Sequence, residues 1–142
     1  MDSNGGSNLG GLGVTGLQLQ QSGGSATYGS RQTVTFSFDR PVSNLSFYIV
    51  DLDRTGSYFD HVALSGKPTI TLVGAVTGTG TTTDGLRTTL AAADLSPNNG
   101  RGNAKVTYTS TLTSFTADFW SASGTGGQQV FITGFTFTAA GC

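Results

Sequence analysis

The feature of this sequence that most limits its fold is a period-two alternation of apolar and polar residues. Val34, Phe36 and Phe38 alternate with threonine and serine, which is the pattern of a β-strand with one buried face. A second run, residues 45–52, is apolar on both of its faces, so we expect it to be a central strand of a sheet. Residues 39–41, Asp-Arg-Pro, lie between the two runs, and we predict that they end the first strand.

The composition also favours strands over helices. The eight acidic residues are all aspartate, and threonine, serine and glycine fill the positions that glutamate, lysine and alanine occupy on helix surfaces. Strand-like runs recur along the chain with turn signals about every 8–12 residues. Together with the length of 142 residues, this predicts an all-β fold, an antiparallel, jelly-roll-like β-sandwich of about eight or nine strands.

The chain divides into a short arm and one domain. Residues 1–13 are rich in Gly, Ser and Asn and are expected to form a flexible arm or linker. Residues 14–142 are expected to form the single β-sandwich domain. Cys142 is the one cysteine, so no intramolecular disulfide is expected. Residues 91–94, Ala-Ala-Ala-Asp, are the one stretch that suits a helical turn.

Charge and hydropathy exclude two classes of partner. Seven basic residues against eight acidic ones give a net charge of −1, which provides no basic field for a nucleic acid backbone. No apolar run approaches the roughly 18–20 residues that span a bilayer, so no membrane insertion is expected. A chain rich in Thr, Ser and Gly with few lysines is typical of a secreted bacterial surface module, and we expect an extracellular or cell-surface location.

The densest polar cluster follows the second apolar run. Asp51 and Asp53 stand two residues apart at a strand end, so their carboxylates project to the same side, and the next turn returns a third carboxylate, Asp60. Calcium prefers several oxygen ligands at about 2.3–2.6 Å, and the backbone carbonyls of Thr55 or Ser57 would add to the carboxylates. This spacing predicts a calcium site.

Two interpretations of this loop remain open. It begins like an EF-hand loop, Asp-x-Asp-x-Thr-Gly, but lacks the closing glutamate, so calcium would be bound by a loop of the sandwich. In the alternative, the aspartates cap turns and pair with Arg54, Arg40 or His61 on a solvated rim.

Catalysis is not expected. His61 is the one histidine, and the chain has no glutamate and no internal cysteine, which does not suit a zinc site of ordinary composition. The nucleophile-elbow pattern Gly-x-Ser-x-Gly is absent, and no spacing selects a pair of aspartates for glycoside hydrolysis.

Three aromatic residues suit a carbohydrate ligand. Tyr58 and Phe59 lie in the aspartate-rich loop, and Trp120 ends a strand on the face opposite Phe119, beside Asp118. Aromatic faces next to carboxylates hold sugar rings by stacking and by hydrogen bonds to hydroxyls. The alternative, that Trp120 belongs to the core or anchors a loop, also stays open.

A longer pattern runs through residues 34–64: a phenylalanine-rich strand, Pro-Val, a strand ending in Asp-x-Asp, and then Asp-x-Val. This pattern resembles the β-sandwich modules of large bacterial extracellular and cell-surface proteins, and residues 129–138 are similar to their last strand. The resemblance implies an adhesive or carbohydrate-binding role that is compatible with calcium and involves no catalysis. It implies no particular ligand residue.

The expected function is therefore a non-catalytic structural or adhesive module that is stabilised by calcium. The first alternative is a carbohydrate-binding module that uses the three aromatic residues. The second is a fibre subunit in which the N-terminal arm adds as a strand to the exposed sheet edge of a neighbouring copy.

Overall fold

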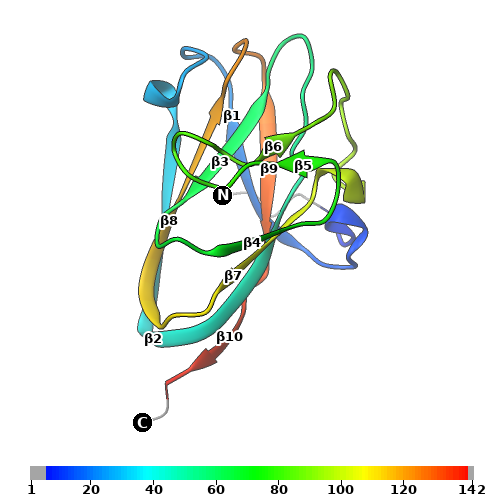
Figure 1. Ribbon diagram of the computed structural model, residues 1–142. Coiled ribbons are helices and arrows are strands. Elements are labelled where there is room, and N and C mark those ends of the chain that lie inside the picture. The colour runs from blue at the N-terminus through cyan, green and yellow to red at the C-terminus, as the bar shows by residue number, and fades with distance from the viewer. Residues whose placement is uncertain (1–5, 141–142) are drawn as a thin grey trace.

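Eight antiparallel strands form a sheet that folds into two facing layers, and the long strand β2 belongs to both layers (Figure 1). Two further strands, β5 and β6, form a separate two-stranded sheet. The computed structural model describes residues 6–140. Cys142 and the first five residues of the expected arm lie outside this range. The strands are β1 Gly16–Gln21, β2 Gln32–Val50, β3 Asp60–Leu64, β4 Thr69–Leu72, β5 Val76–Thr77, β6 Arg87–Thr88, β7 Ala104–Tyr108, β8 Leu112–Ser121, β9 Gln128–Thr133 and β10 Thr136–Ala139.

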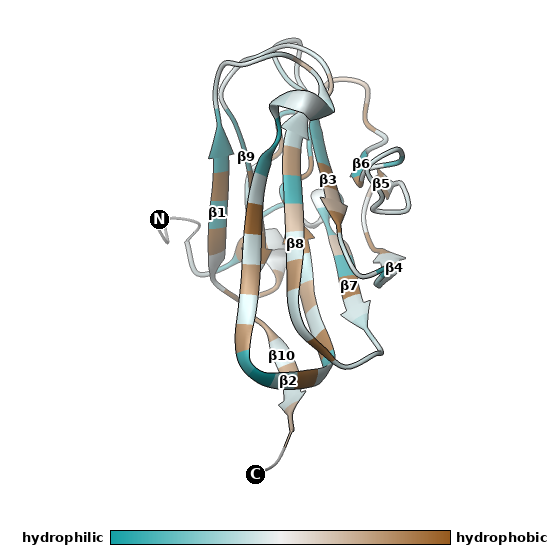
Figure 2. Cartoon of the chain, turned by 90° about the vertical axis from the view of Figure 1, so that its left-hand side faces the viewer, coloured by the Kyte–Doolittle hydropathy of each residue, from teal (hydrophilic) through white to brown (hydrophobic). Residues whose placement is uncertain are grey.

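The two layers share strand β2 but use different halves of it. The first half of β2, residues 32–37, pairs with β8, and β8 pairs with β3. The second half lies between β9 and β7 in a layer with the order β1-β9-β2-β7-β4, and β10 pairs with the middle of β2. Figure 2 shows β2 folding back at one end of the molecule, where it passes from one layer to the other. The central position predicted for residues 45–52 is confirmed for residues 45–50, and the strand ends at Val50, two residues earlier than predicted.

The predicted strand end at residues 39–41 is wrong. β2 is continuous over 19 residues, and at this point it changes partners, with a register shift between Ser37 and Val42. A proline cannot donate a hydrogen bond to a regular ladder, but it is tolerated where the ladder is irregular. Pro41 therefore marks the bend of a strand that changes layers, not the end of one.

The expected fold class, an all-β antiparallel sandwich, is confirmed, although its sheets do not close on each other. There are ten strands because β5 and β6 form an additional pair of two residues each. Residues 91–94 do not form the expected helical turn, since Ala93 makes an antiparallel bridge with Arg54. The described helices are the three-residue 3-10 turns η1 Leu9–Gly11, η2 Tyr28–Ser30 and η3 Gly100–Gly102. None of them is long and apolar enough to cross a membrane.

Aromatic rings fill the core between the layers. Phe115 is 2% exposed, and its ring centroid lies 4.9 Å from that of Phe36 and 5.3 Å from those of Phe47 and Tyr108. Phe36 is on the inward face that the period-two pattern predicts, and Phe47 belongs to the same core cluster.

Part of the expected arm is packed against the domain. Leu9, in η1, is fully buried and packs with Val50 and Phe131 on the outer face of the second layer. The side-chain amide of Asn103 donates to the carbonyl of Gly10 at 2.9 Å. The segment around η1 therefore contributes to the fold and differs from the expected loose linker.

Candidate functional site

A polar pocket of about 270 Å³ lies where β2 ends and β9 begins. The side chains that give it its chemistry come from four stretches of the chain: β1, residues 51–58 after β2, the segment between β6 and η3, and the start of β9. They are Gln20, Asp51, Asp53, Tyr58, Asp94, Gln128 and Gln129.

Asp51 is the most unusual residue of this pocket. It directly follows β2 with a φ of 68°, a left-handed conformation that few residues other than Gly, Asn and Asp adopt. Asp51 is 2% exposed, and its Oδ1 has no hydrogen-bond partner among the described residues. The other oxygen accepts a long bond of 3.4 Å from the amide of Gln129. Burial, and then the charge of Asp53, raise the pKa of Asp51 to about 7.

Asp53 ties the pocket to the segment that follows β6. Its Oδ2 accepts a hydrogen bond of 2.6 Å from the backbone N–H of Leu95. Asp53 is 3% exposed, and burial raises its pKa even though the hydrogen bond from Leu95 acts in the opposite direction. A second buried carboxylate thus lies close to Asp51 in the same pocket.

Asp60 lies behind Asp53 and is not among the residues that line the pocket. It is fully buried, and its Oδ2 accepts from the backbone N–H of Asp53 at 3.2 Å. In the amide orientation that gives its atoms compatible partners, Gln128 donates to Oδ1 of Asp60 at 2.9 Å. Burial, followed by the charge of Asp53, raises the pKa of Asp60 well above its usual value. With both oxygens partnered, Asp60 holds the loop together from behind.

Thr55 and Ser57 form the turn of the loop and do not line the pocket. The hydroxyl of Thr55 accepts from the backbone N–H of Ser57 at 3.0 Å. The carbonyl of Ser57 accepts from Gly126 at 2.8 Å, and the N–H of Thr55 donates to the carbonyl of Tyr58 at 3.0 Å. Of the five expected calcium ligands, the structure therefore brings two, Asp51 and Asp53, into the pocket.

Sequence reasoning missed Asp94 as a site residue. The hydroxyl of Tyr58 donates to Oδ1 of Asp94 at 3.4 Å across 36 positions of the chain. The charge of Asp94 contributes to the raised pKa values of both Asp51 and Asp53. No local pattern marks such a residue, because its place in the pocket depends on the path of the chain between β6 and η3.

The alternative interpretation holds in part: Asp60 and Asp53 accept hydrogen bonds from backbone N–H groups of the loops, but the expected pairing with basic groups is not found among the described contacts. The guanidinium of Arg54 lies 4.5 Å above the ring of Phe59, and Nδ1 of His61 is 3.3 Å from the carbonyl of Phe59. Across residues 6–140, no ion pair joins Asp51, Asp53 or Asp60 to a basic side chain. With the side chains in these positions, residues 6–140 contain no group of three or more His, Cys, Asp or Glu side chains that could hold a metal.

Trp120 is covered and presents no free face for stacking on a sugar. It is 5% exposed, with Tyr28 packed edge-on at 5.0 Å and the ring of His61 at 5.3 Å. A Cβ built on Gly85 would lie 2.7 Å from the Trp120 ring, so the backbone also lies directly against it. Phe59 packs on the far side of His61 at 4.5 Å. These contacts place Trp120 as an anchor for η2 and for the loop around Gly85.

Asp118 has structural partners on the outer face of the first layer. It accepts hydrogen bonds from Tyr28 at 2.5 Å and from Thr33 at 2.6 Å, and it forms an ion pair with Arg31 at 3.5 Å. These contacts fasten η2 and the start of β2 to β8. Of the expected sugar-binding residues, Tyr58 is therefore the one that lines the polar pocket described above, which we call the acidic pocket.

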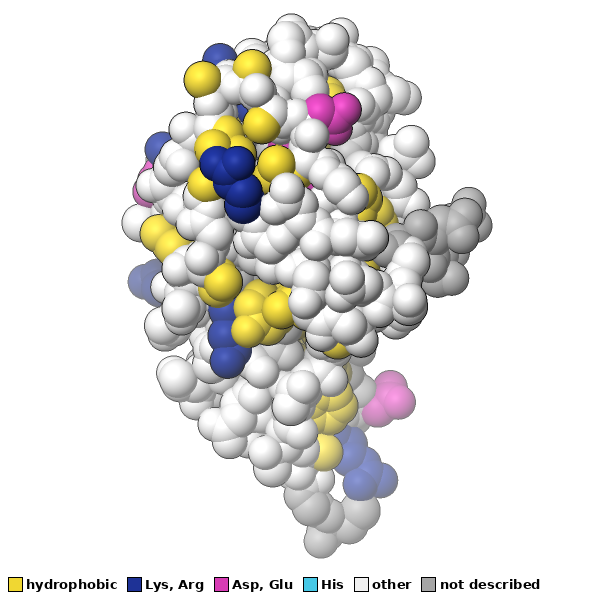
Figure 3. Space-filling model, turned by 90° about the vertical axis from the view of Figure 1, so that its right-hand side faces the viewer, with side chains coloured by type: hydrophobic (Ala, Val, Ile, Leu, Met, Phe, Trp, Pro, Cys, Tyr) yellow, Lys and Arg dark blue, Asp and Glu magenta, His cyan; other side chains and the backbone are white. Residues whose placement is uncertain are grey.

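Charged groups elsewhere are dispersed. On the face shown in Figure 3, Lys and Arg side chains lie in separate patches with uncharged surface between them. The acidic pocket is the place where several carboxyl groups with shifted pKa values lie close together, as is common at functional sites. Comparison with protein-family models, with curated proteins and with solved structures found no match to this chain.

Proposed function

We propose that this chain is a non-catalytic structural or adhesive module of an extracellular or bacterial cell-surface protein, and that calcium bound in the acidic pocket stabilises it. The observation that carries the calcium proposal is the carboxylate of Asp51, which is buried with one oxygen unpartnered among the described residues. A buried charge without a counter-ion costs several kcal/mol. A cation in the pocket would supply the missing partner.

The donor types favour calcium over other metals. The pocket offers carboxylate, amide and phenol oxygens, with no histidine or cysteine among the described residues that line it. Oxygen donors suit hard cations, and calcium accepts irregular sets of 6–8 ligands that include water. Calcium modules of extracellular proteins bind at about 10⁻⁴–10⁻³ M, an affinity that an incomplete protein ligand set can provide.

The test is thermal unfolding of the chain in millimolar calcium and in a chelator. We expect calcium to raise the Tm by several degrees. Asp51→Asn is expected to remove this response and to raise the Tm in the chelator, because asparagine tolerates the positive φ and carries no buried charge. Asp39→Asn removes an exposed aspartate at the bend of β2 and should leave the response intact. A wild-type Tm that does not change with calcium would overturn the proposal.

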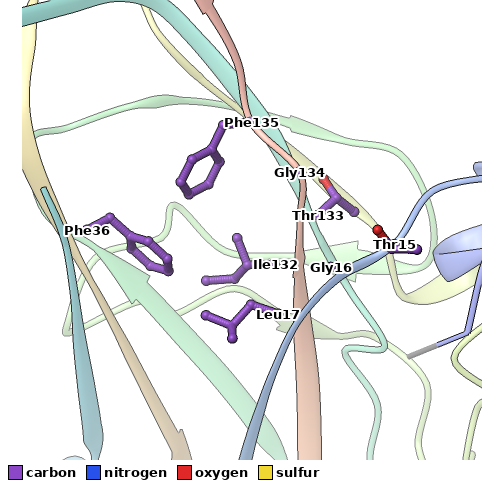
Figure 4. Close-up of a pocket in the computed structure, with 8 residues that line it drawn as sticks. All are labelled: Thr15, Gly16, Leu17, Phe36, Ile132, Thr133, Gly134 and Phe135. Atoms are coloured by element: carbon purple, nitrogen blue, oxygen red, sulfur yellow. The ribbon is translucent and has the colours of Figure 1, made fainter. Parts of the chain in front are cut away.

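A second candidate function is self-association through an open seam of the sandwich. Within residues 6–140, β1 pairs only with β9, and residues 32–37 of β2 pair only with β8, so each strand has one unpaired edge. Between these edges lies an apolar groove of about 260 Å³. Figure 4 shows the side chains of Leu17, Phe36, Ile132 and Phe135 pointing into this groove.

The seam lacks the features that protect free edges. Residues 16–21 and 32–38 contain no charged residue and no proline, whereas natural sheets guard exposed edges with lysine, proline or bulges. The edge strand of a second copy would pair here through its backbone and place alternate apolar side chains in the groove. This proposal uses the edge strand of a second copy as the donor in place of the N-terminal arm, because Leu9 and residues 16–21 already pack within their own domain.

Sedimentation velocity over a range of concentrations tests self-association. We expect the wild-type chain to form oligomers at high concentration, and Leu17→Lys to shift it to monomer by placing a charge in the seam. Thr113→Lys adds the same charge at an exposed position of β8 and should not alter assembly. A wild-type chain that stays monomeric at millimolar concentration would contradict this candidate.

A further inference from the structure

We infer that Asp94 completes the cation site, so that calcium binding fastens the segment between β6 and η3 to the end of β2. This inference rests on the proposed function, since it requires that the pocket binds a cation. It differs from the sequence expectation in its ligands: Asp51, Asp53 and Asp94, with the hydroxyl of Tyr58, replace a set confined to residues 51–60.

The unpartnered oxygen of Asp51 indicates where in the pocket the ion would bind. Asp51 is 2% exposed, lines the pocket, and leaves Oδ1 without a partner in the part of the chain that the structure describes. A native fold rarely leaves a buried carboxylate oxygen unsatisfied, and a bound ion can satisfy such an atom. Because Asp51 follows β2 directly, its backbone is fixed by the sheet and its carboxylate is the rigid part of the site.

Tyr58 lies in the pocket together with the buried carboxylates of Asp51 and Asp53 and the exposed carboxylate of Asp94. Its hydroxyl is 3.4 Å from Oδ1 of Asp94. Asp53, Tyr58 and Asp94 all line the pocket, so the phenol hydroxyl shares it with carboxylates from both segments of the chain. A cation there would attract all three carboxylates, and the hydroxyl would be a further oxygen ligand.

Asp94 is the adjustable ligand. Its side chain is exposed, and the long bond from Tyr58 is the one side-chain hydrogen bond described for it. Its neighbours are held more firmly: Ala93 donates to the carbonyl of Arg54 at 2.7 Å, and Leu95 donates to Asp53 at 2.6 Å. The backbone thus keeps Asp94 beside the pocket while its carboxylate is free to rotate. This explains why the three carboxylates are not already arranged as a metal-binding group.

How firmly the segment between β6 and η3 is attached to the end of β2 depends, in this arrangement, on whether the cation is bound. Without a cation, Asp94 shares the pocket with the carboxylates of Asp51 and Asp53, so like charges push the segment away from the end of β2. With calcium, the same three charges attract one ion. The backbone N–H of Leu95 reports on the change, because its acceptor is a carboxylate oxygen of the site.

Calcium titration calorimetry combined with hydrogen exchange of the full chain tests the inference. In the wild type, we expect calcium to slow exchange in residues 89–99, including Leu95, by at least tenfold. Asp94→Asn should still bind calcium, but about tenfold more weakly and without the added protection. Asp51→Asn should not bind it. The control, Asp39→Asn, should behave as the wild type does.

The two ways in which this experiment can fail are distinguishable. If the wild type binds calcium and Asp94→Asn shows the same affinity and the same protection, the role of Asp94 is wrong while the proposed function stands. If the wild type shows no heat of binding and no protection at millimolar calcium, the proposed calcium site itself is wrong. Protection by magnesium equal to that by calcium would overturn the assignment of calcium.

Discussion

Replacing Phe115 by alanine is expected to lower the free energy of unfolding by about 3–5 kcal/mol, a large part of the total stability of a domain of this size. Phe115 is 2% exposed and lies at the centre of a cluster of rings from both layers. Its removal leaves a cavity that Phe36, Phe47 and Tyr108 cannot fill without leaving their own contacts, because close-packed side chains relax only in part.

Chemical denaturation of the variant measures this loss, and Phe137→Ala is a matched control. Phe137 is also a phenylalanine on a strand, but it is 44% exposed and contacts Phe38 at the margin of the cluster with ring centroids 5.6 Å apart. We expect it to cost roughly 1 kcal/mol or less, because much of its surface is already in water. Equal losses for the two variants would show that the core is not centred on Phe115.

In calcium-free buffer, the protein is expected to be more stable at pH 5 than at pH 8. Burial raises the pKa of Asp51 from 3.8 to about 7, so between these values the folded protein keeps a proton that the unfolded chain has released. Stability from this group is therefore complete below about pH 4 and is lost as the pH rises through 7. The expected loss is about 2–4 kcal/mol. Asp53 and Asp60 act in the same direction, because their pKa values are also raised.

One group opposes this trend. Burial lowers the pKa of His61, so this residue favours the folded state at higher pH, and its contribution is lost as the pH falls below about 6.5. Three buried carboxylates are expected to outweigh one histidine. Thermal unfolding in a chelator from pH 5 to 8 is the measurement. Asp51→Asn should flatten the curve, and a wild-type Tm that rises steadily over this range would show that the carboxylates are not buried as described.

The fold class was predictable because the periodicity of side chains along a strand is local. The inward face of residues 34–38 follows from their alternation alone, and the central place of residues 45–50 follows from their two apolar faces; both runs lie in the sheets as expected. The continuity of β2 was not predictable. Residues 39–41 carry ordinary strand-ending signals, and only the change of partners from β8 to β7 and β9 shows why the strand continues through them.

Part of the candidate site was also predictable, because the spacing of residues along the chain is local. Asp51 and Asp53 are two residues apart just after the end of β2, so their proximity is a local property. Thr55 and Ser57 were expected in the site because of their spacing, but hydrogen bonds within the turn and to Gly126 place them outside the pocket. Trp120, for which a free surface for a sugar and a loop anchor were both left open, is covered by η2 and its neighbours, and its own strand could not decide between the two.

The sequence by itself determined that this chain forms strands, which of their faces turn inward, and where its carboxylates concentrate, because composition and period-two alternation act over neighbouring residues. Only the tertiary structure decided that Asp60 supports the loop from behind, that Asp94 joins the pocket and that a seam stays open between β1 and β2. The physical reason is that burial and long-range contact decide which carboxylate loses its water and which strand edge remains unpaired. Both depend on segments that lie tens of residues apart along the chain.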